Sequence, residues 1–205
     1  MQVVFKADQP VTDAACKKAT GKTLKQWFSQ LDKRDGAKRR ESVYWLYEKQ
    51  GVEAWWATTV FVEYERSKGI VNKKDGRIEG FNICVTKTVA APVKDAYRAW
   101  VDAKALKAWY GKGMSAKVKE DGAFKDEGGN SGQYLRVREN KDLRFTWQHA
   151  KAEAPSRVDV TFADKGKGKT LVTLMHNRIQ NRAEADGLRA AWGAAFGKLK
   201  QMLET

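Results

Sequence analysis

The sequence has few cysteines, prolines and histidines. Its 205 residues include two cysteines, three prolines and two histidines. Cys16 and Cys84 are far apart and lack the spacing of metal ligands, which predicts free thiols in a reducing compartment rather than a disulfide scaffold. A structural zinc site needs a cluster of cysteine and histidine ligands. The sequence contains no such cluster, so we expect no metal and no other cofactor.

Long hydrophobic runs are also missing. None approaches the roughly 20 residues that a helix needs to cross a bilayer, so we expect no transmembrane segment. The opening residues, MQVVFK, form too short an apolar patch for a secretory signal. Hydrophobic residues make up 42% of the chain and charged residues 31%, which is typical of a globular protein. We therefore expect a cytoplasmic protein.

Familiar catalytic motifs are absent as well. Two Gly-Lys-Thr words begin at Gly21 and Gly168, but a P-loop requires another glycine five positions earlier, where Cys16 and Ala163 stand. No serine lies in a nucleophile turn with histidine and aspartate partners in order. The acidic residues fall mostly in turns and on helix exteriors, so no catalytic carboxylate pair is indicated. We assign no catalytic residue, and an enzyme is the less favoured class.

Positive charge is in excess, with a formal net charge of +14. The electric field of such a positive charge raises the rate at which the protein encounters anions, including nucleic acid. The one tight basic cluster, Lys38, Arg39 and Arg40, precedes a stretch that loosely resembles a helix-turn-helix around Gly51. The next helix would begin with residues 53–56, EAWW, which offer no side chain for reading base edges. Binding of a protein or a nucleic acid through this basic segment is an alternative function, with nucleic acid the less favoured partner.

Residues 10–68 predict a small all-α bundle. Thr12 and Thr23 are suited to cap two helices, Asp35-Gly36 to end the second, and Gly51 to end the third. The second helix carries an apolar stripe at i, i+3, i+4 and i+7, namely Leu24, Trp27, Phe28 and Leu31. The four expected helices span about 12–21, 23–35, 38–50 and 53–66.

Residues 69–77 are rich in turn formers and basic side chains, which predicts a linker. From Gly80 the hydrophobic period changes to two, because Phe81, Ile83 and Val85 alternate with polar residues, as in a half-buried strand. Two short helices are expected next. Later strands, separated by glycine, asparagine and aspartate turns, are expected at 114–119, 123–126, 133–138, 143–148, 156–162 and 170–176. Residues 78–204 therefore predict a second domain.

The C-terminal segment predicts one long amphipathic helix. Its apolar residues fall within an arc of about 120°. They are Leu188, Trp192, Ala195, Phe196, Leu199, Met202 and Leu203. We expect an α+β helix-grip fold, in which a curved antiparallel sheet of about seven strands wraps around this helix, preceded by the small N-terminal bundle.

Residues 80–203 resemble the SRPBCC or START-like superfamily and, within it, homologues of the activator of the Hsp90 ATPase. The matching words are VAAPVKDAYRAWVD from Val89, LKAWYG from Leu106, LRFTW from Leu143, SRVDVTF from Ser156 and GKTLVTLMH from Gly168. The resemblance implies non-catalytic binding of a hydrophobic small molecule or lipid. One alternative is a cyclase-like or hydrolase-like enzyme using the same cavity. The other is a co-chaperone-like protein interaction or nucleic-acid-binding adaptor through the basic helical domain, and the family name itself is not taken to imply a chaperone role.

Residues 12–66 resemble a small uncharacterised helical domain that is found beside such folds. The matching words are ATGKTLKQW from Ala19 and YWLYEKQG from Tyr44. This resemblance implies no activity.

We expect the ligand between the sheet and the last helix, where aromatic rings either fill the space or leave room for a flat or lipidic molecule. The predicted ligand-binding residues are Trp109, Phe124, Tyr134, Phe145, Trp147, Met175, His176, Trp192 and Phe196.

Strand parity places Tyr134 and Arg136 on one face, so that Arg136 or Gln133 would either supply a polar anchor or face water. His176 is expected to bond to backbone at the mouth, or to face the cavity as a polar contact or proton shuttle. His149 is expected to be exposed.

Overall fold

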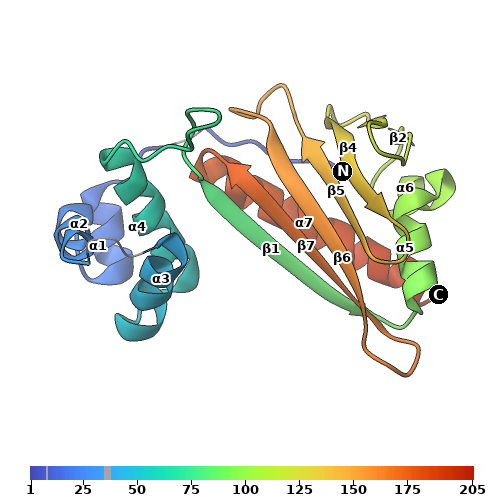
Figure 1. The fold of residues 1–205 in the computed structure, drawn as a ribbon, viewed down its shortest axis with the longest axis horizontal. Coiled ribbons are helices and arrows are strands. Elements are labelled where there is room, and N and C mark those ends of the chain that lie inside the picture. Colours follow the sequence, from blue (N-terminus) through green and yellow to red (C-terminus); the bar gives the residue numbers. More distant parts are fainter. Residues whose placement is uncertain (8, 35–37) are drawn as a thin grey trace. The chain divides into compact units, whose positions relative to one another are not determined.

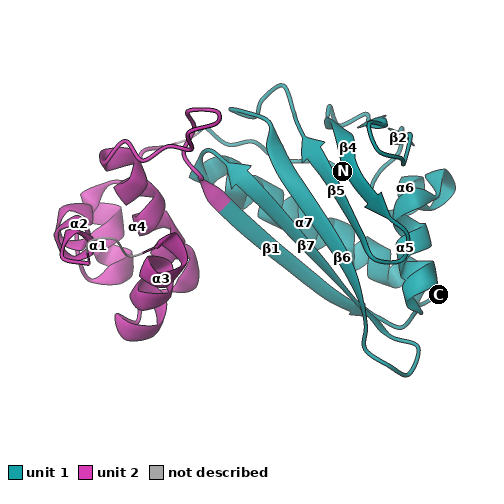
Figure 2. Cartoon of the chain, in the orientation of Figure 1, with its two compact units in different colours: residues 1–7, 82–205 teal, residues 8–81 magenta. Residues whose placement is uncertain are grey.

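The computed structural model describes residues 1–7, 9–34 and 38–205. The chain divides into two compact units, Asp8–Phe81 and Met1–Ala7 with Asn82–Thr205 (Figure 2). We call them the helical unit and the sheet unit. Residues 1–7 lie outside both domains that the sequence predicts, yet they belong to the sheet unit.

The helical unit contains α1 (Asp13–Thr20), α2 (Leu24–Asp32), α3 (Arg39–Tyr44), the π-helical turn η1 (Trp45–Lys49) and α4 (Ala54–Ser67). The Thr12 and Thr23 side chains accept hydrogen bonds from the first turns of α1 and α2, as their sequence positions predict. Gly51 follows η1 with a φ of +67°, a conformation that glycine adopts easily. The helix end expected at Asp35-Gly36 lies outside the described residues.

The core of the helical unit is built from large apolar side chains. Trp27, Leu31, Leu46 and Val60 are buried in one cluster. The expected third α-helix changes to a π-helix at Trp45, whose ring meets that of Trp27 edge-on at 6.4 Å between centroids. Each fully buried ring or branched side chain stabilises this small core by roughly 1.5–3 kcal/mol.

The sheet unit contains seven strands and three helices among its described residues. They are β1 (Phe81–Val89), α5 (Val93–Val101), α6 (Ala103–Trp109), β2 (Ser115–Ala116), β3 (Ala123–Lys125), β4 (Ser131–Arg138), β5 (Asp142–Trp147), β6 (Ser156–Asp164), β7 (Thr170–Ile179) and α7 (Arg182–Leu203). The strand order is β1-β7-β6-β5-β4-β3-β2, and α7 lies across one face of the sheet (Figure 1). The predicted α+β helix-grip fold is confirmed.

One predicted strand is much shorter than expected. The sequence favours a strand at 114–119, but β2 holds only Ser115 and Ala116. The chain then turns, because the Lys119 N–H donates to the Lys117 carbonyl and the Gly122 N–H donates to the Lys119 carbonyl. These two bonds replace the ladder that a longer strand would form.

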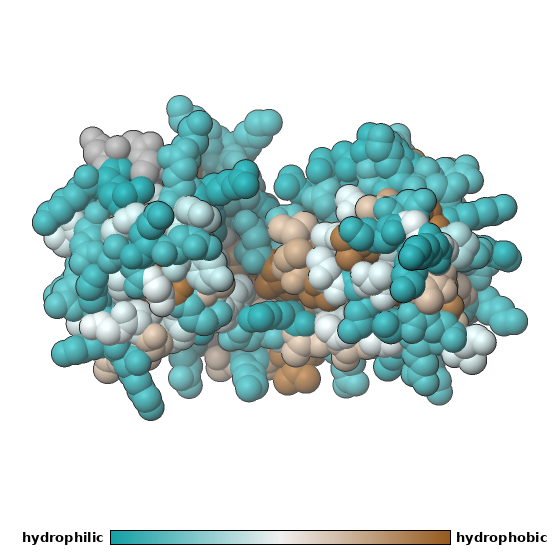
Figure 3. Space-filling model, turned by 90° about the horizontal axis from the view of Figure 1, so that it is seen from below, coloured by the Kyte–Doolittle hydropathy of each residue, from teal (hydrophilic) through white to brown (hydrophobic). Residues whose placement is uncertain are grey.

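Burial alternates along β6 and β7, which gives the sheet an inner face toward α7 and an outer face. The apolar stripe of α7 faces the inner side, where Leu188, Trp192, Phe196 and Leu199 are buried. Polar side chains cover most of the visible surface of each unit (Figure 3). The core of the sheet unit therefore lies between the inner face and α7.

A β-bulge interrupts β4 and overturns one expectation. Tyr134 pairs with Phe145 but Arg136 pairs with Arg144, so Leu135 is an extra residue in β4. The bulge moves Arg136 to the outer face, where it bonds Asp142. The parity argument that placed Arg136 beside Tyr134 is therefore wrong. Gln133 is no interior anchor either, because it is exposed and donates to the Asp121 carbonyl.

Residues 1–7 lie against the sheet unit in an extended conformation. Met1 is buried and Val3 and Phe5 are half-buried, whereas the residues between them are exposed. We call this stretch the N-terminal segment. Its amino group pairs with Asp126 at 2.7 Å, and the Asn130 side chain donates to the Met1 carbonyl.

Three glycines allow the N-terminal segment to approach this closely. A Cβ atom at Gly111 would lie 2.7 Å from the Met1 nitrogen, and one at Gly128 would lie 2.8 Å from the Met1 oxygen. A Cβ atom at Gly187, in α7, would lie 2.4 Å from the Val4 oxygen. Real Cβ atoms do not approach other backbone atoms so closely, so the three positions that contact the N-terminal segment need residues without side chains.

We predict that Gly187→Ala lowers the free energy of unfolding, by about 1–3 kcal/mol, because the added methyl group overlaps the N-terminal segment. The matched control is Gly193→Ala in the same helix, where the methyl group would meet nothing within 4 Å. That control should raise stability by roughly 0.5–1 kcal/mol, since alanine favours helix more than glycine does. Urea unfolding of both variants measures the difference. Equal stabilisation in both would show that the segment is not seated at Gly187.

Candidate ligand-binding site

Eight of the nine residues predicted to bind a ligand are buried in the sheet unit. Phe124, Tyr134 and Phe145 form one group, with ring centroids 5.4–5.8 Å apart. Trp192 contacts Phe196 and His176, and Trp147 contacts His176 in turn. Trp109 stacks at a tilt on Trp100, at 4.5 Å between centroids. These eight residues are therefore interior, and their role as ligand contacts stays a prediction.

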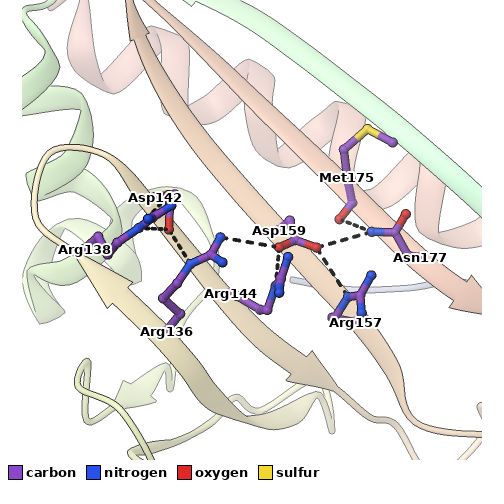
Figure 4. A network of polar contacts seen from close by, with 8 residues as sticks. All are labelled: Arg136, Arg138, Asp142, Arg144, Arg157, Asp159, Met175 and Asn177. Atoms are coloured by element: carbon purple, nitrogen blue, oxygen red, sulfur yellow. Dashed lines mark hydrogen bonds and ion pairs between the residues drawn. The ribbon is translucent and has the colours of Figure 1, made fainter. Parts of the chain in front are cut away.

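Met175 is the exception. It is next to His176 in β7, and adjacent strand residues point to opposite faces. Because His176 is buried on the inner side, Met175 lies on the outer face, where it pairs with Asp159 (Figure 4). The prediction that Met175 lines the interior is wrong.

A chain of hydrogen bonds joins α7 to the sheet through His176. The Trp192 indole N–H donates to His176 Nδ1 at 3.0 Å. The other ring nitrogen, Nε2, must then carry the proton that it donates to Ser156 Oγ at 2.6 Å, and Ser156 Oγ donates to the Trp147 carbonyl. His176 is a neutral structural residue that bonds side chains, rather than the mouth residue or proton shuttle that its sequence position suggests.

The interior retains very little free space. A cavity of about 10 Å³ lies among Trp100, Leu106, Tyr110, Met114 and the three rings of the Phe124 group. A water molecule needs about 10–15 Å³, so this space admits one water at most. The ligand-sized hollow expected between the sheet and the last helix is filled by the protein's own rings.

A larger pocket opens beside the N-terminal segment. Its volume is about 840 Å³, within the range of small-molecule sites. Met1, Val3 and Phe5 form one wall, Trp109 and Tyr110 another, and Ala191, Ala194 and Ala195 of α7 a third. Lys112, Glu127, Lys151 and Lys198 add charged groups to the lining. We call this the segment pocket; Trp109 is the one predicted site residue that lines it.

His149 lines the segment pocket and is buried, not exposed as expected. The Lys151 N–H donates to His149 Nδ1 at 3.0 Å, so Nε2 carries the proton and donates to the Gly128 carbonyl at 2.9 Å. The Phe5 ring stacks on the imidazole at 4.5 Å between centroids. His149 therefore holds together the turn at Gly128, the end of β5 and the N-terminal segment.

Tyr110 forms the boundary between the segment pocket and the small interior cavity. Its hydroxyl is buried, and the Trp147 side chain is its polar neighbour. Burial raises the pKa of Tyr110, and the nearby Asp126 carboxylate raises it further. The phenol is therefore neutral and can donate a hydrogen bond.

The basic cluster of the helical unit is partly used by the fold. Arg39 pairs with Glu65 and donates to the Gly80 carbonyl. Burial raises the pKa of Glu65, and the Arg39 charge opposes that rise. Lys38 and Arg40 are exposed. Because Arg39 is committed to an internal ion pair, two of the three predicted cations face solvent.

Sequence reasoning missed the N-terminal segment and Tyr110 as parts of the site. The signal was present, because Met1, Val3 and Phe5 alternate with Gln2, Val4 and Lys6 at the period of a strand. No helix in the described part of the chain is long and apolar enough to cross a membrane. Across residues 1–7, 9–34 and 38–205, no three His, Cys, Asp or Glu side chains are grouped to hold a metal ion.

The curved sheet gripping a long helix, with its interior packed by aromatic residues, defines a START-like or SRPBCC-type protein. The chain belongs to the family described as activator of Hsp90 ATPase homolog 1-like protein, whose model matches residues 90–204. No curated protein matches the chain.

Several solved structures share the fold over 60% of the chain. CalU16 from Micromonospora echinospora is 22% identical, with 75% of its own chain covered and a TM-score of 0.54. An HSP90 activator from Plasmodium falciparum is 19% identical, with 96% covered and a TM-score of 0.56. The Aha1 dimer from Colwellia psychrerythraea is 17% identical, with 96% covered and a TM-score of 0.55. At these identities the likeness shows the fold alone.

We predict that the stability of the sheet unit falls with acid because of His176. Burial lowers the pKa of His176 from its ordinary value near 6.5 to about 3. Between these values the unfolded chain binds one proton that the folded chain does not, so stability falls as the pH drops through this window, by about 1.4 kcal/mol per pH unit. Urea unfolding between pH 7 and pH 5 measures the slope.

The variant His176→Phe should be less stable at neutral pH, because it loses both hydrogen bonds. Its free energy of unfolding should fall less steeply toward pH 5, because its unfolding takes up about one proton fewer. The variant His149→Gln leaves His176 in place and should keep the steep decline. An unchanged slope in His176→Phe would contradict the assignment.

Proposed function

We propose that the sheet unit binds a small molecule with an apolar body and an acidic group in the segment pocket, without chemical turnover. The observation that carries the proposal is the pocket itself, which has about 840 Å³ of space, whereas the interior cavity holds only about 10 Å³. The walls from Val3, Phe5, Trp109 and the alanines of α7 suit an apolar body. The proposal keeps the hydrophobic ligand that the sequence suggests and moves it from the interior to its edge.

The charges of the segment pocket favour an acidic group on the ligand. Three lysines line the pocket, Lys112, Lys151 and Lys198, against one carboxylate, Glu127. A lysine ammonium at a partly enclosed site attracts a carboxylate more strongly than it does in open water.

The histidines support binding rather than catalysis. Both ring nitrogens of His149 and both of His176 are engaged in hydrogen bonds. Acid–base catalysis by either imidazole would require breaking a bond that holds the fold together. The pocket therefore offers shape and charge to a ligand.

We predict that Ala194→Leu weakens binding of decanoate about tenfold or more, because the larger side chain fills the pocket, a loss of about 1.4 kcal/mol or more. Ala194 is exposed and lines the pocket, whereas Ala190, on the same helix, is exposed and does not. Ala190→Leu is therefore the matched control and should leave binding unchanged. Calorimetric titration of both variants measures the effect, and leucine is nearly as good a helix former as alanine, so folding should be retained.

A second variant tests the acidic group. Lys112→Gln should weaken decanoate and leave decanol unchanged, because only the carboxylate interacts with the ammonium charge. Equal affinities of Ala194→Leu and Ala190→Leu would disprove the proposed site. Equal losses for decanoate and decanol in Lys112→Gln would disprove the preference for an acid.

A further inference from the structure

Four arginines lie together on the outer face of the sheet, away from the segment pocket. Arg136 and Arg138 come from β4, Arg144 from β5 and Arg157 from β6 (Figure 4). They surround two carboxylates, Asp142 and Asp159. We call these six residues the arginine face.

The two carboxylates hold the four guanidinium groups in place. Arg136 donates to Asp142 at 2.7 Å, and Arg138 pairs with the same carboxylate. The hydrogen bond from Arg138, and then that from Arg136, lowers the pKa of Asp142. Around Asp159, Arg144 forms a hydrogen bond and Arg157 approaches to 3.4 Å, while Arg136 lies 4.0 Å away. The guanidinium groups are therefore ordered before any partner arrives.

Stability alone does not account for this arrangement. Arg136 and Arg144 are paired residues on adjacent strands, and like charges directly opposite each other destabilise a sheet. The bulge after Tyr134 creates the conflict, because regular alternation would have paired Arg144 with Leu135. The arginine side chains are 31–47% exposed, and ion pairs at such exposure contribute little to stability.

The composition of this part of the sheet is that of a binding surface rather than a solvated one. The whole chain has 26 lysines and 13 arginines. Within the four strands β4, β5, β6 and β7, leaving out the turns between them, there are five arginines and no lysine. Arginine and methionine are enriched in protein interfaces, whereas lysine is depleted. Leu135 is exposed in β4, and Met175 lies beside the Asp159 contacts.

We propose that the arginine face binds a carboxylate-rich segment of a protein partner. A guanidinium carries five N–H donors in a planar fork that matches a carboxylate, and the contacts to Asp142 and Asp159 leave donors available on each arginine. The four arginines and two aspartates have a net charge of +2, so a partner with a few carboxylates completes the charge balance. The two fixed aspartates disfavour a continuous polyanion such as nucleic acid, because each would repel a neighbouring phosphate.

The test uses the full-length chain and a short fluorescent polyglutamate peptide at low salt. The wild type should bind the peptide, and Arg144→Gln with Arg157→Gln should weaken binding about tenfold or more, since both guanidinium groups that lie nearest Asp159 are removed. The matched control is Lys165→Gln with Lys167→Gln, in the exposed turn after β6, which removes the same charge from the same unit. That control should retain binding within about twofold.

Each other outcome overturns the proposal. Equal losses in the two double variants would mean that net charge alone attracts the peptide, and no binding by the wild type would mean that the face is a solvated surface. A thymidine oligonucleotide that binds more tightly than polyglutamate, and depends on Arg144 and Arg157, would assign the face to nucleic acid. If the double variant fails to fold, the single variant Arg157→Gln replaces it. This change removes one exposed arginine and keeps the contact between Arg144 and Asp159, so the fold should be retained. Binding of the peptide should still be measurably weaker.

Discussion

The hydrogen bond from the Trp192 indole to His176 fixes α7 to the sheet, and the packing of the interior is arranged around it. A donor and an acceptor that are both fully buried have to satisfy each other, because water cannot reach either. His176 is in turn hydrogen-bonded to Ser156, and Ser156 is hydrogen-bonded to the backbone of β5 at Trp147. The depth and rotation of α7 are thus set by a polar chain, and the aromatic rings fill the space that remains on either side.

That packing decides where the protein can hold another molecule. With room for one water at most, the interior cannot admit a ligand unless its rings move apart. The segment pocket lies instead where α6, α7 and the turn at Gly128 diverge, and the N-terminal segment supplies the remaining wall. The two faces of the sheet then serve different purposes: the inner face closes the core, and the outer face carries ordered charge.

The architecture was predictable from sequence because it rests on periodicity. The apolar stripe of α7 and the alternation of apolar residues in β6 and β7 indicate which side chains are buried. Thr12 and Thr23 indicate where two helices begin, because their side chains accept hydrogen bonds from the first turns. Most interior rings were predictable for the same reason. Whether rings leave space between them depends on rotamers and on contacts between elements, such as that between Trp192 of α7 and Trp100 of α5, and no local pattern encodes these.

The misplaced residues each have a physical cause. Arg136 was assigned to the wrong face because one extra residue, Leu135, reverses the parity of the rest of β4. Met175 could not share a face with its neighbour His176. The N-terminal segment was missed because its partners, Asp126, Asn130 and Gly187, lie more than a hundred residues away in the sequence. Local patterns carry no information on such distant pairings.

The docking of residues 1–7 makes the helical unit an insertion within the sheet unit rather than a domain placed before it. The chain leaves the sheet unit after Ala7 and re-enters it at Asn82, so the helical unit is tethered at both ends. A single proteolytic cut in the stretch 69–77 would break only one of these connections. The two fragments would stay together through the ion pair at Asp126 and the stacking of Phe5 on His149, and they would separate only when the protein unfolds.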